Sequence, residues 1–173
     1  MQLLIGCGKS REKRIVWRGC SEWDNLVTLD INSNHGPDIV HDLNQPLPIQ
    51  DNTCDEIHAY EVLEHCGKLG DYKFFFGQWS DFWRVLKPGG KFMATVPSLT
   101  SPWLFGDPSH TRAISLEQLT FLHQPAYEQV GKTAMSDFRN IYKEDFDIEF
   151  AETHGDTFSF VLSAVKPSRC VYA

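Results

Sequence analysis

Paired cysteines and long apolar runs are both missing from this sequence. The five cysteines are scattered and odd in number: Cys7, Cys20, Cys54, Cys66 and Cys170. Because no Cys-x-x-Cys pair occurs, neither a zinc ribbon nor a disulfide framework is indicated, and the pattern fits a reducing compartment. No stretch approaches the roughly 20 apolar residues that span a bilayer. The apolar residues before Cys7 are too few for a signal peptide. We therefore expect a cytoplasmic protein without a membrane span.

Basic residues are also in the minority. Sixteen Lys and Arg stand against 23 Asp and Glu, so the formal net charge is −7. An acidic surface argues against bulk binding to nucleic acid or to an anionic membrane. The exception is a basic run near the N-terminus: Lys9, Arg11, Lys13 and Arg14. Such a run is either a solvated loop or a contact for an acidic ligand.

Strand and helix signals alternate through the first hundred residues, which is typical of a parallel α/β sheet. Short apolar runs predict strands at 2–5, 26–30, 38–40, 57–60 and 92–96. An aromatic and apolar stripe at helical spacing predicts a helix that packs on this sheet: Phe75, Trp79, Phe82, Trp83 and Leu86. We expect the helix to end at Lys87–Gly90, because Pro cannot continue it and Gly tolerates positive φ.

The C-terminal part of the sequence has a different pattern. Ser115 and Gln118 form a capping box, which predicts a short helix. Alternating apolar residues at 146–151 and 158–164 predict an antiparallel hairpin at the sheet edge. The fold class is therefore predicted as α/β, a Rossmann-like and mostly parallel sheet ending in an antiparallel hairpin. Segment 97–144 is long for a crossover and is expected to form a substrate-side insert.

A Gly-x-Gly turn follows the first predicted strand. Gly6 and Gly8 lack a Cβ, so the backbone can bend sharply there and approach a ligand closely. Asp30 ends the second strand, where a carboxylate can accept hydrogen bonds from both hydroxyls of a ribose. The third glycine of dinucleotide-binding loops is absent, since Lys9–Arg11 follow the turn. This absence favours a ligand without phosphate groups. The alternative is an ordinary glycine turn after a buried strand.

Several tracts, taken in series, resemble the class I S-adenosyl-L-methionine (SAM) methyltransferases. These tracts are residues 4–8, 29–31, 41–43, 47–55, 60–65 and 84–90. A further tract, 105–112, resembles small predicted methyltransferases of a type often linked to cell-envelope or glycan modification. The resemblance covers roughly residues 3–120. It implies a single class I methyltransferase-like domain over residues 1–173, with SAM as the cofactor.

The resemblance also implies which residues contact the methionine and ribose parts of SAM. Gly6, Cys7 and Gly8 would pack against the methionine and the ribose. Asp30 would accept hydrogen bonds from the ribose hydroxyls, and Ile31 would lie against the adenine face. Each such charge-assisted hydrogen bond contributes about 1.5–3 kcal/mol. The structural alternative for Asp30 is a strand-end cap.

Four further residues complete the implied cofactor site. Asp42 would accept a hydrogen bond from the adenine amino group, and Leu43 would donate its backbone N–H to a ring nitrogen. Tyr60 and Glu61 would border the methionine end. The structural alternative for Asp42 is an Asx turn before the prolines that follow.

The sequence departs from the family pattern near its N-terminus. The family has a helix before strand one, whereas this sequence starts at that strand, so the fold is expected to be shortened there. The acid that usually precedes the Gly-x-Gly turn is replaced by Leu4 and Ile5. The basic run stands where the family has its first crossover helix. These departures put cofactor affinity in doubt but leave the fold prediction unchanged.

His110 is the candidate general base, because it lies in a loop beyond strand five and imidazole can take a proton near neutral pH. Asp107 is assigned with it as a catalytic candidate. Asp107 and Arg112 would each orient the substrate or tie down the loop. His65 is the other histidine to weigh, although its spacing from Glu61 equally fits a structural pair. The scattered His and Asp residues lack a recognisable metal spacing, so no metal site is predicted.

The leading functional hypothesis is a SAM-dependent methyltransferase that moves a methyl group to an oxygen or nitrogen by in-line displacement. A small-molecule or glycan-type acceptor is favoured by family analogy, and base methylation of DNA or RNA is disfavoured by the acidic composition. The first alternative is a catalytically silent SAM-binding module that acts through a protein partner. The second is a nicotinamide-dependent oxidoreductase, against which the missing third glycine weighs. The sequence does not indicate an oligomeric state.

Overall fold

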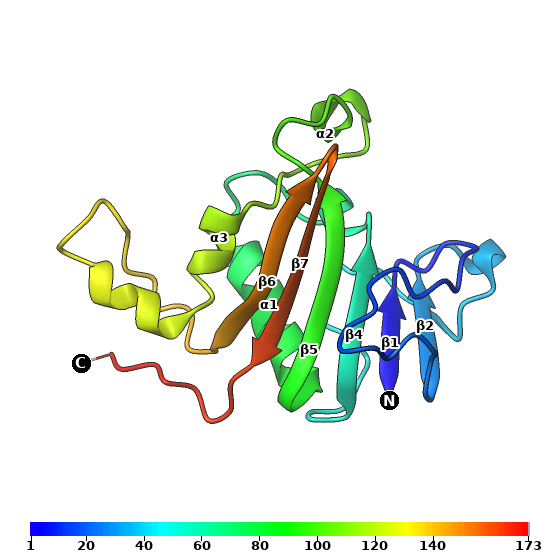
Figure 1. Cartoon of the computed structure of the whole chain (residues 1–173), viewed down its shortest axis with the longest axis horizontal. Helices are drawn as coiled ribbons and strands as arrows, with labels where there is room; N and C mark the ends of the chain where they lie inside the picture. The colour runs from blue at the N-terminus through cyan, green and yellow to red at the C-terminus, as the bar shows by residue number, and fades with distance from the viewer. Residues whose placement is uncertain (173) are drawn as a thin grey trace.

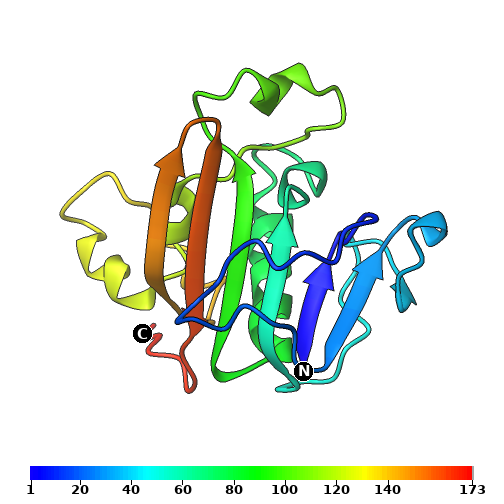
Figure 2. The same ribbon diagram turned by 45° about the vertical axis from the view of Figure 1, so that its right-hand side comes forward.

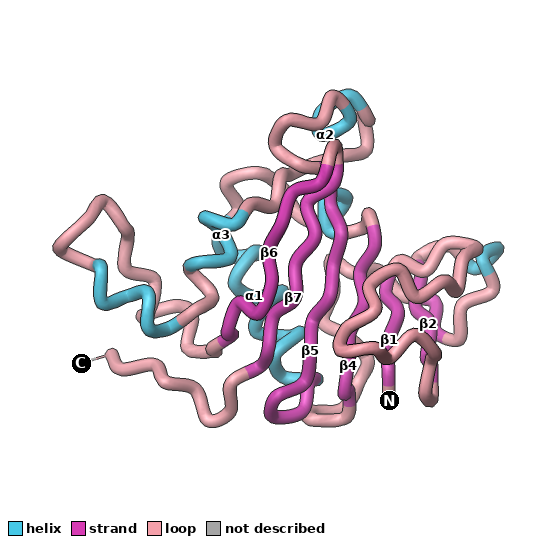
Figure 3. The backbone as a smooth tube through the Cα atoms, viewed as in Figure 1, coloured by secondary structure: helices cyan, strands magenta, loops and turns pink. Residues whose placement is uncertain are grey.

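The computed structural model describes residues 1–172 of the chain. Its centre is one seven-stranded sheet with the order β3-β2-β1-β4-β5-β7-β6 (Figures 1 and 3). The strands are β1 (Gln2–Ile5), β2 (Leu26–Asp30), β3 (Ile39–Val40), β4 (Cys54–Tyr60), β5 (Leu86–Pro97), β6 (Phe146–His154) and β7 (Thr157–Ala164). The first five strands are parallel, and β7 runs antiparallel to both β5 and β6. The predicted mostly parallel sheet with a C-terminal hairpin is confirmed.

The strand order reverses at β1. The chain moves outward from β1 to β2 and β3, and then returns so that β4 pairs with the other side of β1. In open parallel sheets a ligand crevice forms at such a reversal, beyond the carboxyl ends of the strands. The turn after β1 and the turn after β4 therefore border the expected crevice.

Helix α1 (Tyr72–Val85) covers one face of the sheet (Figure 1). It begins at Asp71, whose side chain accepts a hydrogen bond from the backbone N–H of Phe74. Its buried aromatic rings pack on the sheet, with the Trp79 ring 4.9 Å from that of Phe92 and 6.3 Å from that of Phe160. The aromatic stripe is therefore core, as its helical spacing predicted.

The opposite face of the sheet is covered by a loop. Residues 9–24 contain no helix and cross in front of β4 and β5 (Figure 2). Beneath this loop the sheet carries the polar side chains of Gln2, Glu56 and His58 beside a small apolar cluster, on which Ile15 and Trp23 of the loop pack. The basic run therefore replaces the first crossover helix, as expected.

The remaining segments are short. They are α2 (Trp103–Gly106), α3 (Leu116–Thr120) and three 3₁₀ turns at Ser33–His35, Leu63–His65 and Gln124–Gln129. The capping box is confirmed, because the Ser115 hydroxyl and the Gln118 side chain make both of its hydrogen bonds. Among residues 1–172, no helix combines the length and apolar character needed to cross a bilayer.

The main difference from the predicted boundaries is that β4 and β5 begin earlier, so Leu86, predicted on the helix, belongs to β5. β4 begins at Cys54, and β5 begins at Leu86, so Pro88 and Gly90 lie within the strand instead of a separate turn. The reason is a pairing between Cys54 and Leu86, followed by a register shift before Glu56 meets Lys91. A local sequence pattern does not contain this long-range pairing, and Pro-Gly-Gly alone reads as a turn.

Candidate cofactor crevice and active site

The glycine turn after β1 has the backbone that its sequence predicts. Gly6 and Gly8 have φ values of +59° and +54°, which L side chains rarely adopt. A Cβ on Gly6 would overlap the side chain of Val62, whereas a Cβ on Gly8 would meet no atom within 4 Å. Gly6 therefore permits close packing against the turn after β4, and the space beside Gly8 is open.

A cavity of about 310 Å³ lies between this turn and the end of β4. Its walls include five of the nine residues assigned to the cofactor, namely Gly6, Cys7, Gly8, Tyr60 and Glu61. The loop of residues 9–24, here called the basic loop, supplies further lining. The structure thus brings the predicted methionine end of the site together around one open space.

Asp30 lies at the neighbouring strand end and is already well supplied with donors. Its Oδ2 accepts from the backbone N–H of Gly8 at 2.8 Å, and its Oδ1 accepts from Asn32 N at 2.8 Å and contacts His35 Nδ1 at 3.1 Å. Desolvation opposes ionisation of Asp30, yet these three hydrogen bonds outweigh it and hold its pKa below the usual value. The carboxylate therefore shapes the glycine turn, and about one of its four lone-pair positions remains for a ligand.

The residues assigned to adenine lie around the same edge of the sheet. Ile31 is 68% exposed, so its side chain is free to cover a planar ring. Asp42 Oδ1 accepts from both the backbone and the side-chain nitrogen of Asn44, which is the Asx turn weighed as its alternative. Leu43 turns toward α1, where its carbonyl accepts from Gln78 Nε2 at 3.2 Å. The adenine roles of these residues stay predictions.

Tyr60 and Glu61 end β4 in two different environments. The Tyr60 hydroxyl accepts from Ile15 N at 3.2 Å and lies 2.6 Å from His58 Nδ1, so it is committed to holding the basic loop. Glu61 is exposed and has a φ of +53°, although it carries a Cβ. Such backbone strain in a non-glycine residue persists where the surroundings enforce it, and it is concentrated at functional sites.

Arg11 joins the two loops that border the crevice, and the sequence did not single out this role. Its guanidinium donates to the carbonyls of Gly8 and Ser10 and, across the gap, to those of His35 and Gly36. One side chain thus ties the turn after β1 to the turn after β2. The only signal for Arg11 in the sequence was its place in the basic run. Of the two interpretations of that run, a loop agrees with these contacts better than a binding site for an acidic ligand.

His110 and Asp107, the two catalytic candidates, lie near each other in the loop beyond β5, and their catalytic roles stay predictions. His110 Nε2 lies 3.9 Å from Asp107 Oδ2 and also 3.9 Å from Glu64 Oε1. The loop is held next to the Leu63–His65 turn because the backbone N–H groups of Thr111 and Arg112 both donate to Glu64 O. The ring of His65 lies 4.6 Å from that of His110, so both histidines belong to one cluster.

Glu64 is the member of this cluster that the sequence did not assign. Burial raises its pKa to about 8, because only 1% of the residue is exposed. Arg112 lies near it but is bonded elsewhere, through Nε to Leu63 O and through Nη2 to Gln78 Oε1. Arg112 is 4% exposed, and burial lowers its pKa to about 10. Of the two roles weighed for Arg112, the structure supports tying down the loop.

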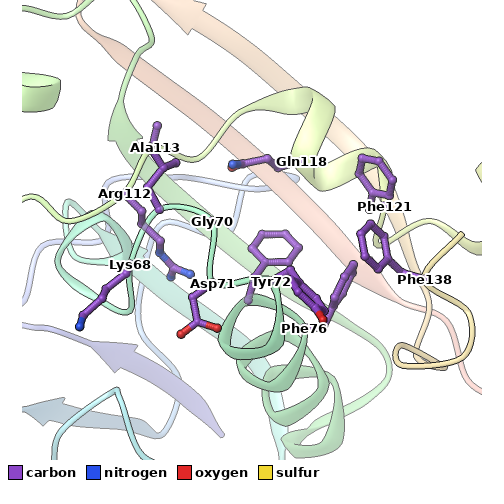
Figure 4. A pocket seen from close by; sticks show the side chains of 12 residues that line it. Lys68, Gly70, Asp71, Tyr72, Phe76, Arg112, Ala113, Gln118, Phe121 and Phe138 are labelled. Carbon is purple, nitrogen blue, oxygen red and sulfur yellow. The ribbon is translucent and has the colours of Figure 1, made fainter. Parts of the chain in front are cut away.

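A second cavity, of about 160 Å³, opens between the start of α1 and α3 (Figure 4). Five of its twelve lining residues are aromatic, among them Tyr72, Phe76, Phe121 and Phe138, and Arg112 and Gln118 contribute polar groups. Small-molecule sites commonly measure about 300–1,000 Å³. This cavity is therefore large enough for only part of a ligand.

Comparison with known proteins identifies the family. The family described as methyltransferase domain matches residues 3–94, which is more than half of the chain. No curated protein matches this chain.

Solved structures share the fold at low sequence identity. A SAM-dependent methyltransferase from Archaeoglobus fulgidus has a TM-score of 0.59 and 17% identity, with 94% of this chain and 85% of that chain covered. A putative methyltransferase of Haloferax volcanii, complexed with the Trm112 methyltransferase activator, has a TM-score of 0.60 and 15% identity, with 95% and 82% covered. The N-methyltransferase NodS from Bradyrhizobium japonicum, complexed with S-adenosyl-L-homocysteine, has a TM-score of 0.55 and 13% identity, with 94% and 76% covered.

These likenesses agree with the strand order and the C-terminal hairpin described above. The family match itself begins within β1 and ends within β5, so it includes the glycine turn, Asp30 and the end of β4. On this match the chain belongs to the methyltransferase domain family.

Proposed function

We propose that this protein is a SAM-dependent methyltransferase that moves a methyl group to an oxygen or nitrogen of a small-molecule or glycan-type acceptor. The observation that carries the proposal is the open glycine turn at the strand-order reversal, with Asp30 beside it and a cavity reaching the end of β4. The family assignment supports SAM as the cofactor. When bound, SAM supplies a methyl group that is already electrophilic, so the protein needs no covalent nucleophile.

The residues present fit such a cofactor. The open space beside Gly8 and the cavity that reaches Glu61 would take the methionine and ribose parts. Asp30 would bind the ribose, and its free lone-pair position accommodates one hydroxyl without change. A second hydrogen bond from ribose would replace the contact of His35. Ile31 would cover the adenine.

The side chains proposed to lie near the methyl acceptor are those of Asp107 and His110, in the loop that follows α2. His110 Nδ1 lies 3.2 Å from Leu104 O, to which it can only donate, so Nε2 keeps its lone pair. That nitrogen can accept a proton from an acceptor hydroxyl or amine, and Asp107 would stabilise the imidazolium that results. Alignment of the acceptor behind the methyl group contributes about 7–11 kcal/mol of barrier reduction in well-oriented reactions.

A silent SAM-binding module is the second candidate, and one observation favours it. Three donors already occupy the carboxylate of Asp30, so the group reserved for ribose has a structural task in the free protein. In a module that acts only by binding a protein partner, the Asp30 carboxylate would serve to stabilise the fold in this way. Cofactor binding and turnover separate the two candidates.

The first test is calorimetric titration of the protein with SAM, S-adenosyl-L-homocysteine and NADH. We expect both sulfur compounds to bind and NADH not to bind. Asp30→Ala should weaken SAM binding at least about tenfold, or 1.4 kcal/mol. Asp38→Ala is the matched control. The Asp38 carboxylate accepts hydrogen bonds from Thr28, which lies on β2 as Asp30 does, but Asp38 makes none of the crevice contacts described above. Equal SAM affinity in Asp30→Ala and wild type contradicts the ribose assignment.

The second test is turnover of labelled methyl groups in a cell extract. We expect wild-type protein to label a small-molecule or glycan fraction, and His110→Ala to lower the rate while leaving SAM affinity unchanged. Binding of SAM without any labelled product favours the silent module. Equal turnover in His110→Ala and wild type removes His110 from catalysis.

A further inference from the structure

Three potential metal ligands converge where the turn after β4 meets the loop after α2. They are Glu64, His65 and His110, and one ligand atom from each lies within 4.8 Å of the other two. Glu64 and His65 are neighbours in sequence, but His110 reaches them only because the Thr111 backbone pairs with Glu64 O. The sequence predicted no metal site, since no local spacing links His110 to the other two.

Glu64 points to a ligand that is missing from its surroundings. The residue is 1% exposed, and neither Oε1 nor Oε2 has a hydrogen-bond partner among residues 1–172. A buried carboxyl group without partners is costly, and native structures avoid it unless an ion or another group completes the site. Arg112 does not supply that partner, because it forms no ion pair with Glu64 in the described chain and donates to Leu63 O and Gln78 through two of its nitrogens. Its Nη1 is buried without a partner, so its charge lies near Glu64 but no hydrogen bond joins them.

Both imidazole rings have a nitrogen left for coordination. His110 Nδ1 donates to Leu104 O at 3.2 Å, so its lone pair is on Nε2, which lies 3.9 Å from Glu64 Oε1. The Ser109 hydroxyl donates to Asp107 Oδ1 and therefore accepts from His65 Nδ1 at 3.1 Å. His65 Nε2 then also keeps its lone pair. Metal-binding histidines usually donate their second ring N–H in this way, which fixes the tautomer and the ring orientation.

We infer that Glu64, His65 and His110 bind one divalent transition-metal ion of the zinc type. Two imidazoles and one carboxylate suit borderline ions such as Zn²⁺ and Co²⁺ better than Mg²⁺ or Ca²⁺, which prefer oxygen ligands. The ion would neutralise the Glu64 carboxylate and give its oxygens the partner that the protein does not provide. The negative charge of Asp107, 3.9 Å from His110 Nε2, adds to the attraction for a cation.

Three protein ligands leave at least one position of a tetrahedral zinc ion open, which is the arrangement of catalytic zinc sites. A water molecule, or a hydroxyl of the methyl acceptor, would occupy that position. Coordination lowers the pKa of such a hydroxyl and so prepares an oxygen nucleophile. With the ion bound, His110 Nε2 is a ligand, and the ion replaces His110 as the group that activates the acceptor. This last step rests on the proposed methyltransferase function, whereas the binding of the ion does not.

Metal binding is tested without turnover. The tag-free chain, freed of metal by a chelator, is titrated with Zn²⁺ by calorimetry and with Co²⁺ by visible absorption. We expect one ion per chain, a dissociation constant in the micromolar range or tighter, and the absorption bands of four-coordinate Co²⁺. Glu64→Gln and His65→Ala should each weaken Zn²⁺ binding at least about tenfold. His154→Ala removes an exposed imidazole elsewhere and should bind as wild type does.

Thermal unfolding separates loss of a ligand from loss of the fold. His65 is exposed and Glu64→Gln is nearly isosteric, so both variants should melt like metal-free wild type. Saturating Zn²⁺ should raise the melting temperature of wild type and of His154→Ala but not of the two site variants. The inference is overturned if wild type and His65→Ala bind Zn²⁺ equally. Metal binding without methyl transfer would leave this site standing and remove only the proposed function.

Discussion

At the scale of single residues, the glycine turn and Asp30 have a structural task in addition to the cofactor binding proposed for them. Gly6 permits the turn after β1 to touch Val62, and the neighbouring Gly8 leaves open space. Asp30 orders that turn through Gly8 N before any ligand arrives. A preformed turn of this kind lowers the conformational entropy that a ligand must remove on binding. Substitutions here therefore need controls that separate folding from affinity.

Gly6→Ala should destabilise the fold more than Gly155→Ala. The two glycines have φ values of +59° and +57°, so both substitutions carry the same left-handed penalty of about 1–2 kcal/mol. Only the new Cβ at position 6 overlaps a neighbour, the side chain of Val62, which adds about 1–3 kcal/mol. Chemical unfolding of both variants measures the difference. Val62→Ala combined with Gly6→Ala should recover part of it, and equal losses in the two single variants would contradict the steric explanation.

The sequence predicted individual residues well where the signal was local. The glycine turn after β1 and Asp30 at the end of β2 follow from short tracts, and the structure places both there. The catalytic roles of His110 and Asp107 stay predictions. Arg11 and Glu64 were not assigned, because their partners come from loops that are distant in the sequence. Hydrogen bonds between loops carry no periodicity and no spacing that a single sequence reveals.

At the scale of elements, the loop of residues 9–24 takes the place of a crossover helix. Glu56 Oε2, on β4, accepts from Gln2 Nε2 at 2.7 Å and from His58 Nε2 at 2.9 Å, and pairs with Lys13 Nζ at 3.0 Å. Burial lowers the pKa of His58, which stays neutral, and its other nitrogen accepts from the Tyr60 hydroxyl. The loop is thus held to the sheet by a polar network centred on one carboxylate and by the packing of Ile15 and Trp23 on a small apolar cluster.

Lys13→Met should destabilise the protein by about 3 kcal/mol, because it leaves the buried carboxylate of Glu56 without its cation. The Lys13 side chain is 2% exposed and that of Glu56 is 17% exposed. A double-mutant cycle with Glu56→Gln should give a coupling energy of about 2 kcal/mol. The control cycle uses Lys87→Met and Asp55→Asn, a pair that is 45% and 52% exposed, and should give less than about 1 kcal/mol. Equal couplings would show that the loop is not held by this pair.

The elements were predictable where their hydrophobic period is strong. Helix α1 and the hairpin of β6 and β7 were found because their buried faces repeat at 3.6 and 2 residues, respectively. The start of β5 was misplaced, since Pro88 and Gly90 signal a turn in isolation while β4 holds them in the strand. The 97–144 segment has no strong period, and the structure correspondingly gives it only short helices.

At the scale of the whole molecule, several carboxylates have lowered pKa values. A side-chain hydrogen bond from Thr28 lowers the pKa of Asp38, and one from Lys87 lowers that of Asp55. For Asp30, hydrogen bonds outweigh the opposing desolvation. The unfolded chain binds protons on these groups near pH 3.8, whereas the native chain does so only at lower pH. Stability from these groups is therefore present above pH 3.8 and is lost as the pH falls through the native values.

We expect the denaturant midpoint to fall steadily as the pH is lowered from about 5 to about 2.5. In Asp30→Asn the fall should be shallower, because one carboxylate with a lowered pKa is gone. Guanidinium unfolding curves at a series of pH values measure both slopes. Identical slopes for the variant and wild type would show that Asp30 does not ionise differently in the two states.

The backbone amide of Ile15 reports whether the loop of residues 9–24 is closed on the sheet. It donates to the Tyr60 hydroxyl at the floor of the basic loop, and the same loop supplies Ser10, Glu12 and Arg14 to the crevice wall. Because only polar contacts and a small apolar cluster hold the loop of residues 9–24, we expect it to open as a local unit while the sheet stays folded. A ligand that binds in the crevice and contacts this loop would stabilise the closed state of the loop. We therefore expect a bound ligand to favour the closed loop and to slow deuterium uptake at the Ile15 amide.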